Sequence, residues 1–178
     1  MTAPLPLHLH AAPSAGFDEP FDMLAACHER VERMLTLLER LAAHLPDHGC
    51  DPQAVAAARD VMRYFDLAAP AHHEDEERHV LPALRAAGDD AFAAQLEQEH
   101  REMQRRWVEL RRNLAEVVKG TWVGTGAADF ATWHRFAELY RGHAAAEDAH
   151  AFPTARHALD AEQQRAMGEE MASRRGLR

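Results

Sequence analysis

The sequence is poor in cysteine, glycine and aromatic residues, and it contains no long hydrophobic run. Only two cysteines occur among 178 residues, Cys27 and Cys50, and they form no C-x-x-C pair. This argues against a disulfide framework and favours free thiols in a reducing compartment. No segment approaches the roughly 20 apolar residues of a membrane span. The N-terminus lacks the basic start and apolar run of a signal peptide. We therefore expect a cytoplasmic protein that does not insert into membranes.

Excess positive charge is also lacking, since the net charge is −9 at pH 7. This balance argues against nucleic acid or an anionic membrane as a partner. Sparse glycine, plentiful alanine and leucine, and 28% charged residues are typical of an all-helical protein. The chain is long enough for one domain with a substantial core. Its oligomeric state is left open.

Hydrophobic residues recur three and four positions apart along most of the chain, which predicts long amphipathic helices. We expect four of them, at about residues 20–44, 52–87, 89–119 and 127–152, and a short one at 161–172. Long helices joined by short loops pack as antiparallel neighbours. The predicted fold is therefore all-α, an up-down-up-down antiparallel four-helix bundle with a short C-terminal helix. Pro82 is expected to kink the second helix or to end its regular part.

Three regions follow from this division. We expect an irregular N-terminal arm at 1–16, a metal-binding four-helix bundle at 17–155 and a C-terminal helical tail at 156–178. The arm carries His8 and His10, which we expect to be solvated. The basic residues at the end of the tail, including Arg174 and Arg175, are likewise expected to lie in solvent.

Histidine is unusually frequent, with thirteen residues, and its positions repeat. Two H-x-x-x-E segments each carry a proline ten residues after the histidine: His72 to Glu76 with Pro82, and His143 to Glu147 with Pro153. Each is preceded by a helical pattern with one inward histidine, His28 or His100. His28 to His72 spans 44 residues and His100 to His143 spans 43. This indicates an internal duplication of a two-helix unit.

In a four-helix bundle the inward side chains of the two units would meet on the axis. The candidate metal ligands are His28, His72, Glu76, His100, His143 and Glu147. A buried carboxylate is costly unless it is paired or binds a metal. Four imidazoles and two carboxylates suit two iron ions, with each glutamate bridging the pair. A metal-free layer of hydrogen-bonded pairs and a single zinc ion are the alternatives.

The first H-x-x-x-E segment allows a second register, because His73 and Glu77 are also four residues apart. The duplication aligns His72 with His143, whereas His73 aligns with Ala144. We therefore choose His72 and Glu76. His73 and Glu77 are expected to flank the ligands or to support them from behind.

A different di-iron arrangement is possible in principle, because E-x-x-H also occurs twice, ending at His79 and at His150. Ferritin-like bundles use that motif. They also need a long crossover between the second and third helices, and the short turn at Gly88 and Asp89 offers no room for one. We expect His79 and His150 to face outward or to contact the ligands from behind.

The histidines and the two H-x-x-x-E segments, each followed by Leu-Pro or Phe-Pro, resemble the hemerythrin-like HHE cation-binding domain family over roughly residues 17–155. This resemblance implies a non-heme di-iron centre, bridged by the two glutamates, that meets oxygen, nitric oxide or peroxide. Oxygen-carrying hemerythrins have a fifth histidine on the third helix, four residues from the first. Here Leu96 and Gln104 stand at those positions, so a ligand position is open or filled by water. Asp148 matches the H-x4-D pattern of those carriers and is a rival bridge to Glu147.

We therefore expect a di-iron protein that binds or senses a small diatomic or peroxide ligand. A di-iron oxidoreductase acting on peroxide or nitric oxide and an iron storage or delivery protein are the alternatives. All three would use the same ligands, so the motifs leave enzymatic activity undecided.

Overall fold

The computed structural model describes residues 16–124 and 127–177, which are 87% helical and contain no strand. The prediction of an all-α protein is confirmed for this part of the chain. The predicted irregular arm, with His8 and His10, lies outside the described residues apart from Gly16.

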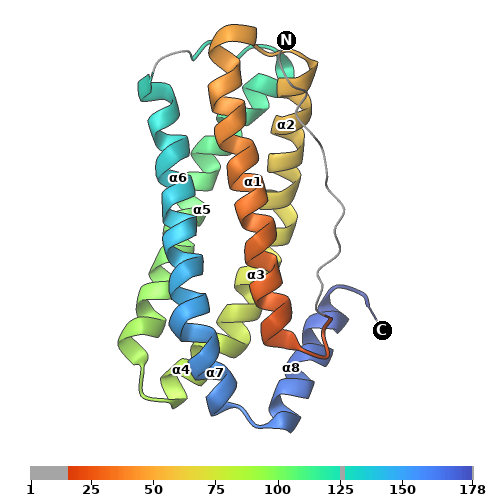
Figure 1. Ribbon diagram of the computed structural model, residues 1–178, viewed down its shortest axis with the longest axis vertical. Coiled ribbons are helices and arrows are strands. Elements are labelled where there is room, and N and C mark those ends of the chain that lie inside the picture. The colour runs from red at the N-terminus through yellow and green to blue at the C-terminus, as the bar shows by residue number, and fades with distance from the viewer. Residues whose placement is uncertain (1–15, 125–126, 178) are drawn as a thin grey trace.

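Four long helical segments and one short helix make up the structure (Figure 1). The helices are α1 (Pro20–His48), α2 (Pro52–Arg63), α3 (Ala69–Asp75), α4 (Leu81–Ala86), α5 (Asp90–Lys119), α6 (Ala127–Ala146), α7 (Phe152–Ala158) and α8 (Ala161–Arg174). Three π-helical turns join some of them into continuous segments: η1 (Tyr64–Ala68), η2 (Glu76–Val80) and η3 (Glu147–Ala151). The long segments are thus α1, α2 to α4, α5, and α6 to α7. Helices α1 and α5 each pack against both α2 and α6, which closes a ring around one axis.

Helix α1 continues four residues beyond its predicted end at His44, because Pro46 does not stop it. Proline removes one backbone hydrogen bond, and only two residues of α1 follow Pro46. The helix ends at Gly49, whose φ of 61° suits a residue without a side chain. Asp51 then caps α2 by accepting a hydrogen bond from the Ala54 amide at 2.8 Å.

Each π-helical turn is followed two residues later by a proline: Pro70 after η1, Pro82 after η2 and Pro153 after η3. A proline ring inside an α-helix clashes with the carbonyl four residues earlier. The wider π turn relieves this clash and lets the helix resume. The second helix is therefore interrupted near Pro82, as predicted, but it does not end there and runs on to Ala86.

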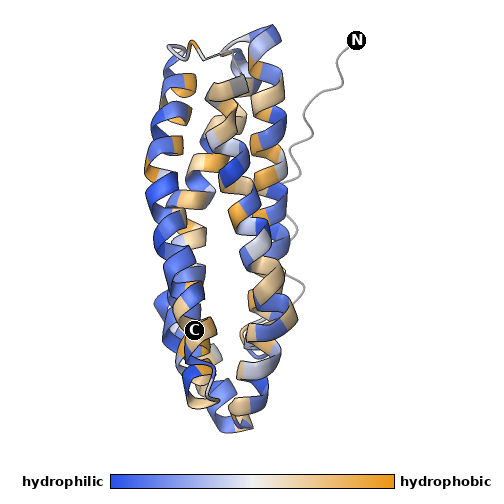
Figure 2. Ribbon diagram, turned by 90° about the vertical axis from the view of Figure 1, so that its left-hand side faces the viewer, coloured by the Kyte–Doolittle hydropathy of each residue, from blue (hydrophilic) through white to orange (hydrophobic). Residues whose placement is uncertain are grey.

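Buried apolar side chains form two clusters at different levels along the axis. The first lies between α1, α2, α5 and α6 and contains Leu38, Val61 and Trp133. The second lies around the start of α1, with α4, α7 and α8, and contains Leu84 and Phe152. Figure 2 shows hydrophobic and hydrophilic residues along every helix, as expected of helices that each bury one face.

Helix α8 packs against the lower part of α1 in Figure 1. The prediction that its basic C-terminal end lies in solvent is wrong, because Arg174 and Arg175 pair with a buried carboxylate. The carboxylate of Asp75 is 0% exposed, and it forms ion pairs with Arg174 and Arg175. A carboxylate buried this deeply needs cationic partners, and the tail supplies them. At Gly168 an added Cβ would lie 1.9 Å from the Phe17 carbonyl oxygen, so the close approach of α8 requires glycine.

We predict that replacing both arginines in the variant Arg174→Ala/Arg175→Ala lowers the free energy of unfolding by about 3 kcal/mol, because Asp75 would keep a buried charge without a partner. Urea unfolding measures the difference. Arg165→Ala is the matched control, since Arg165 lies on the same helix and pairs with exposed Glu169. Equal stability of the double variant and the control would contradict this role of the tail.

Candidate metal centre

A layer of seven polar side chains separates the two apolar clusters. They are His28 from α1, His72 and His73 from α3, Glu76 from η2, His100 from α5, His143 from α6 and Glu147 from η3. All six ligands proposed from the sequence are among them. Each of the four long segments contributes at least one side chain, so the layer depends on the whole bundle.

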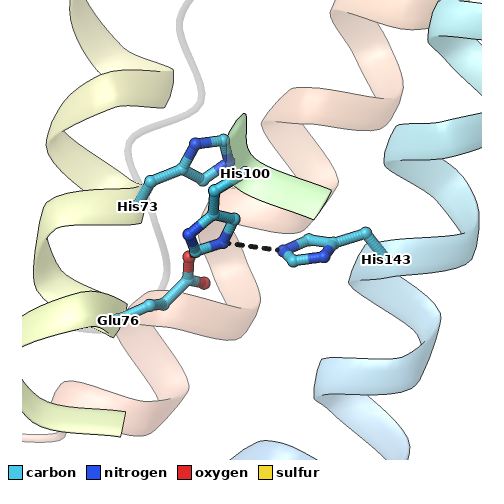
Figure 3. Close-up of side chains that lie close together, drawn as sticks. All are labelled: His73, Glu76, His100 and His143. Atoms are coloured by element: carbon cyan, nitrogen blue, oxygen red, sulfur yellow. Dashed lines mark hydrogen bonds and ion pairs between the residues drawn. The ribbon is translucent and has the colours of Figure 1, made fainter. Parts of the chain in front are cut away.

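These side chains form two groups, and within each group four donor atoms lie within 4.8 Å of one another. The His28 cluster consists of His28, His72, Glu76 and Glu147. The His100 cluster consists of His73, Glu76, His100 and His143. Figure 3 shows the three imidazoles of the His100 cluster converging near the Glu76 carboxylate. In that cluster Nε2 of His100 and Nε2 of His143 are 3.0 Å apart.

Glu76 belongs to both clusters and turns one oxygen toward each. Its Oε1 lies 2.9 Å from Nε2 of His72, and its Oε2 lies 3.4 Å from Nε2 of His100. Glu147 also spans the two groups, because its oxygens lie 3.2 Å from Nε2 of His28 and 3.2 Å from Nε2 of His143. Both carboxylates therefore have the placement of bridging groups.

Three of the imidazoles are held from behind by carboxylates. Nδ1 of His28 lies 2.9 Å from Asp148, Nδ1 of His100 lies 3.0 Å from Glu77, and Nδ1 of His143 lies 2.7 Å from Glu99. A hydrogen bond at Nδ1 fixes the ring orientation and leaves Nε2 to face the axis.

The duplication explains two of these supports. Asp148 and Glu77 directly follow the two inward glutamates, and each reaches the lone histidine of the other unit. Asp148 is 47% exposed and lies behind His28, whereas Glu147 is fully buried between the clusters. Of the two rival bridges, the structure places only Glu147 on the axis.

Seven of the inward polar atoms lack hydrogen-bond partners. Nε2 of His28, both nitrogens of His72 and all four carboxylate oxygens of Glu76 and Glu147 are buried without one. Such atoms are rare in folded proteins, because each costs the free energy of its lost hydration. A divalent cation would satisfy them, since imidazole nitrogen and carboxylate oxygen are both suitable ligands for such metals. The donor set thus fits metal ions.

Electrostatics in the metal-free layer favour protonated imidazoles. Burial alone would lower the pKa of His28, but its hydrogen bond to Asp148 and the nearby carboxylate of Glu147 outweigh burial and raise the pKa to about 12. For His72 burial also acts to lower the pKa, and the nearby Glu76 carboxylate raises it to about 10. Protons on these rings therefore supply the positive charge that the buried carboxylates need.

The same balance holds for His143 and is reversed for His73. Burial acts to lower the pKa of His143, but the nearby carboxylate of Glu147 and a hydrogen bond to Glu99 raise it to about 9. Burial and the neighbouring His100 hold the pKa of His73 well below its usual value. His73 is thus neutral at pH 7, which is the form that binds a metal.

His73 is the one member of the layer that the sequence analysis placed outside the ligand set. Its ring stacks on His100 and Tyr140, at centroid distances of 4.1 and 5.7 Å. Glu76 lies four residues after His72 and three after His73, and both spacings share a helix face. Two adjacent histidines placed four and three residues before a glutamate are the signal that was available in the sequence.

With His73 the layer contains five imidazoles. The fifth imidazole does not come from α5, the third long segment, where Leu96 and Gln104 stand. It is His73 of α3, in the second long segment. Glu77, the other residue of the alternative register, stays outside both clusters and supports His100 from behind.

The remaining motif histidines lie away from the layer. Nε2 of His79 is 2.8 Å from Glu170, and Nε2 of His150 is 2.6 Å from Asp89. Neither belongs to a cluster of potential ligands in the described part of the chain. The E-x-x-H arrangement of ferritin-like bundles is therefore not formed.

Comparison with known proteins is consistent with this geometry. Residues 19–155 match the model of the Hemerythrin HHE cation binding domain. The chain belongs to this family. An uncharacterised protein of Haemophilus influenzae is 30% identical over 166 residues, covering 92% of this chain and 94% of that protein. The HHE domain thus spans the four long segments, and the tail helix α8 follows it. None of the described helices is long and apolar enough to cross a membrane.

For the HHE domain we predict that His72→Ala and His73→Ala each remove about one of two bound ions, because the two rings belong to different clusters. Iron analysis after anaerobic loading with ferrous iron and gel filtration gives the content. His79→Ala, one turn further along the same segment, should retain both ions. Full iron content in His73→Ala would show that His73 flanks the ligands and does not bind metal itself.

Metal binding is also predicted to release about two to three protons at pH 7, because imidazoles with pKa values of about 9, 10 and 12 must be deprotonated to bind. The affinity should consequently rise with pH between about 6 and 9. Calorimetric titration in buffers of different ionisation enthalpy counts the protons. Binding with no proton exchange would show that these rings do not serve as ligands.

Proposed function

We propose that this protein holds a non-heme di-iron centre and uses it to bind or sense a small ligand such as dioxygen, nitric oxide or peroxide. The observation that carries the proposal is the position of Glu76 between two clusters of imidazoles, with one oxygen toward each. Carboxylates that bridge two ions, with histidines completing each one, suit iron. The proposal takes the long segments as an up-down-up-down antiparallel bundle and the protein as cytoplasmic.

The number of donors argues for two ions rather than one. A structural zinc ion binds four ligands in a tetrahedron, whereas seven side chains point into this layer. The two clusters of four donors share Glu76 and are otherwise distinct. Each cluster therefore offers one ion a nearly complete set of protein ligands.

The protein residues would hold and orient the ions. Asp148, Glu77 and Glu99 keep three imidazoles turned inward, and Glu76 and Glu147 would bridge. Bound iron would supply reversible one-electron chemistry and coordination positions for an external ligand. The His28 cluster has two imidazoles and the His100 cluster has three, so the former leaves more positions to solvent or ligand.

Two other functions use the same donors. A di-iron oxidoreductase would consume peroxide or nitric oxide in repeated cycles. An iron store or delivery protein would take up and release its ions readily. In solution, a binding or sensing protein would show saturable ligand binding. An oxidoreductase would show many turnovers per chain, and an iron store would lose its iron easily.

The test is optical titration of the ferrous protein with each small ligand. We expect a new visible band with oxygen or nitric oxide that saturates at about one ligand per pair of ions, because the pair forms one site. Iron-free protein and the variant Glu147→Ala serve as controls. Consumption of many equivalents of peroxide or nitric oxide per chain would favour the oxidoreductase instead.

A further inference from the structure

The internal duplication places two grooves at corresponding positions on the outside of the polar layer. One lies between α1 and α6 and is lined by His28, Glu29, Glu32, Arg141, Ala144 and Asp148. The other lies between α3 and α5 and is lined by His73, Glu77, His100, Arg101 and Gln104. Aligning the two units pairs Glu29 with Arg101, Glu32 with Gln104 and Ala144 with His73. The two grooves can therefore be compared position by position in size and charge.

The two grooves differ in size. The α1–α6 groove has a volume of about 790 Å³, whereas the α3–α5 groove has about 220 Å³. Residue 144 contributes to this difference, because alanine there leaves open the space that the His73 ring occupies on the other side. Trp107 in the α3–α5 groove also replaces the smaller Leu35 of the α1–α6 groove. Of these two grooves, the α1–α6 groove is the wider one beside the layer.

The two grooves also differ in charge. Carboxylates of Asp22, Glu29, Glu32 and Asp148 line the α1–α6 groove. Its one arginine, Arg141, donates to Glu32 at 2.9 Å and to Glu39 at 2.6 Å, so its charge is matched within the rim. The α3–α5 groove is lined by two carboxylates, Glu74 and Glu77, and Arg101 occupies the place of Glu29. A recess lined by carboxylates raises the local concentration of cations.

The wide groove leads to an unpartnered ligand. His28 lies in its lining, is only 8% exposed, and has an Nε2 atom without a hydrogen-bond partner. Nδ1 of the same ring is held by Asp148, whose carboxylate also lines the groove. A cation that enters from the rim therefore meets carboxylate oxygens first and the buried imidazole last.

We propose that the α1–α6 groove is the route by which a divalent metal cation passes from solvent to the His28 cluster, while His73 narrows the α3–α5 groove. This inference rests on the proposed function only in requiring that the polar layer binds metal. Glu29 and Asp148 are the groups that attract and pass on the cation, and Ala144 keeps the passage open.

The experiment measures how fast metal-free protein takes up ferrous iron under anaerobic, low-salt conditions in a stopped-flow instrument. Ala144→Phe fills the groove without removing any donor. We expect its uptake rate to fall at least about tenfold while the final iron content stays that of the unaltered protein, since the ligands are unchanged. An unaltered rate at normal iron content would overturn the proposal.

Charge reversal at the paired positions provides the matched control and does not depend on the Phe variant folding. Glu29→Arg should slow uptake about threefold to tenfold at low ionic strength, and added salt should reduce the difference. Arg101→Glu should leave the rate within about twofold. Acceleration by Arg101→Glu together with no effect of Glu29→Arg would place the route in the α3–α5 groove. Absence of any iron uptake by the unaltered protein would instead refute the proposed function.

Discussion

The burial of two carboxylates, Glu76 and Glu147, is the constraint on which the rest of this structure depends. Both are fully buried between two apolar clusters, where an uncompensated charge is very unfavourable. Five imidazoles surround them, drawn from each of the four long segments. In the metal-free chain protons on His28, His72 and His143 balance the carboxylates, and bound cations would take over that role. The polar layer therefore links the packing of the bundle to its chemistry.

The two halves of the layer are related by duplication but are not equivalent, and one pair of positions contributes to both the ligand set and the groove size. His73 adds a third imidazole to the His100 cluster and narrows the groove beside it. Ala144, its counterpart, adds no ligand and leaves the other groove open beside His28. This difference between the repeats thus gives one cluster an additional imidazole and the other a wider groove beside it. Under the proposed route, the wider groove is the side on which cations enter.

Much of the fold and most of the layer could be predicted from the sequence, because helical periodicity and duplication are local patterns. The helices and six inward side chains, from His28 to Glu147, followed from spacing alone. His73 was missed because strict alignment of the repeats paired it with an alanine, although its spacing to Glu76 also suits one helix face. The π-helical turns and the pairing of Asp75 with the C-terminal arginines depend on packing between distant segments. Local sequence patterns therefore did not predict them. Pro46 likewise showed that a proline in a final turn need not end a helix.

We propose that Glu76 and Glu147 bridge two iron ions in one polar layer. Low-temperature Mössbauer spectroscopy of the iron-57 protein, oxidised to the ferric state, distinguishes bridged from isolated ions. Two ferric ions joined by bridging ligands couple antiferromagnetically, so we expect quadrupole doublets without magnetic splitting in a small applied field. Magnetically split spectra of isolated high-spin ferric ions would contradict it, because they would show ions that share no bridge.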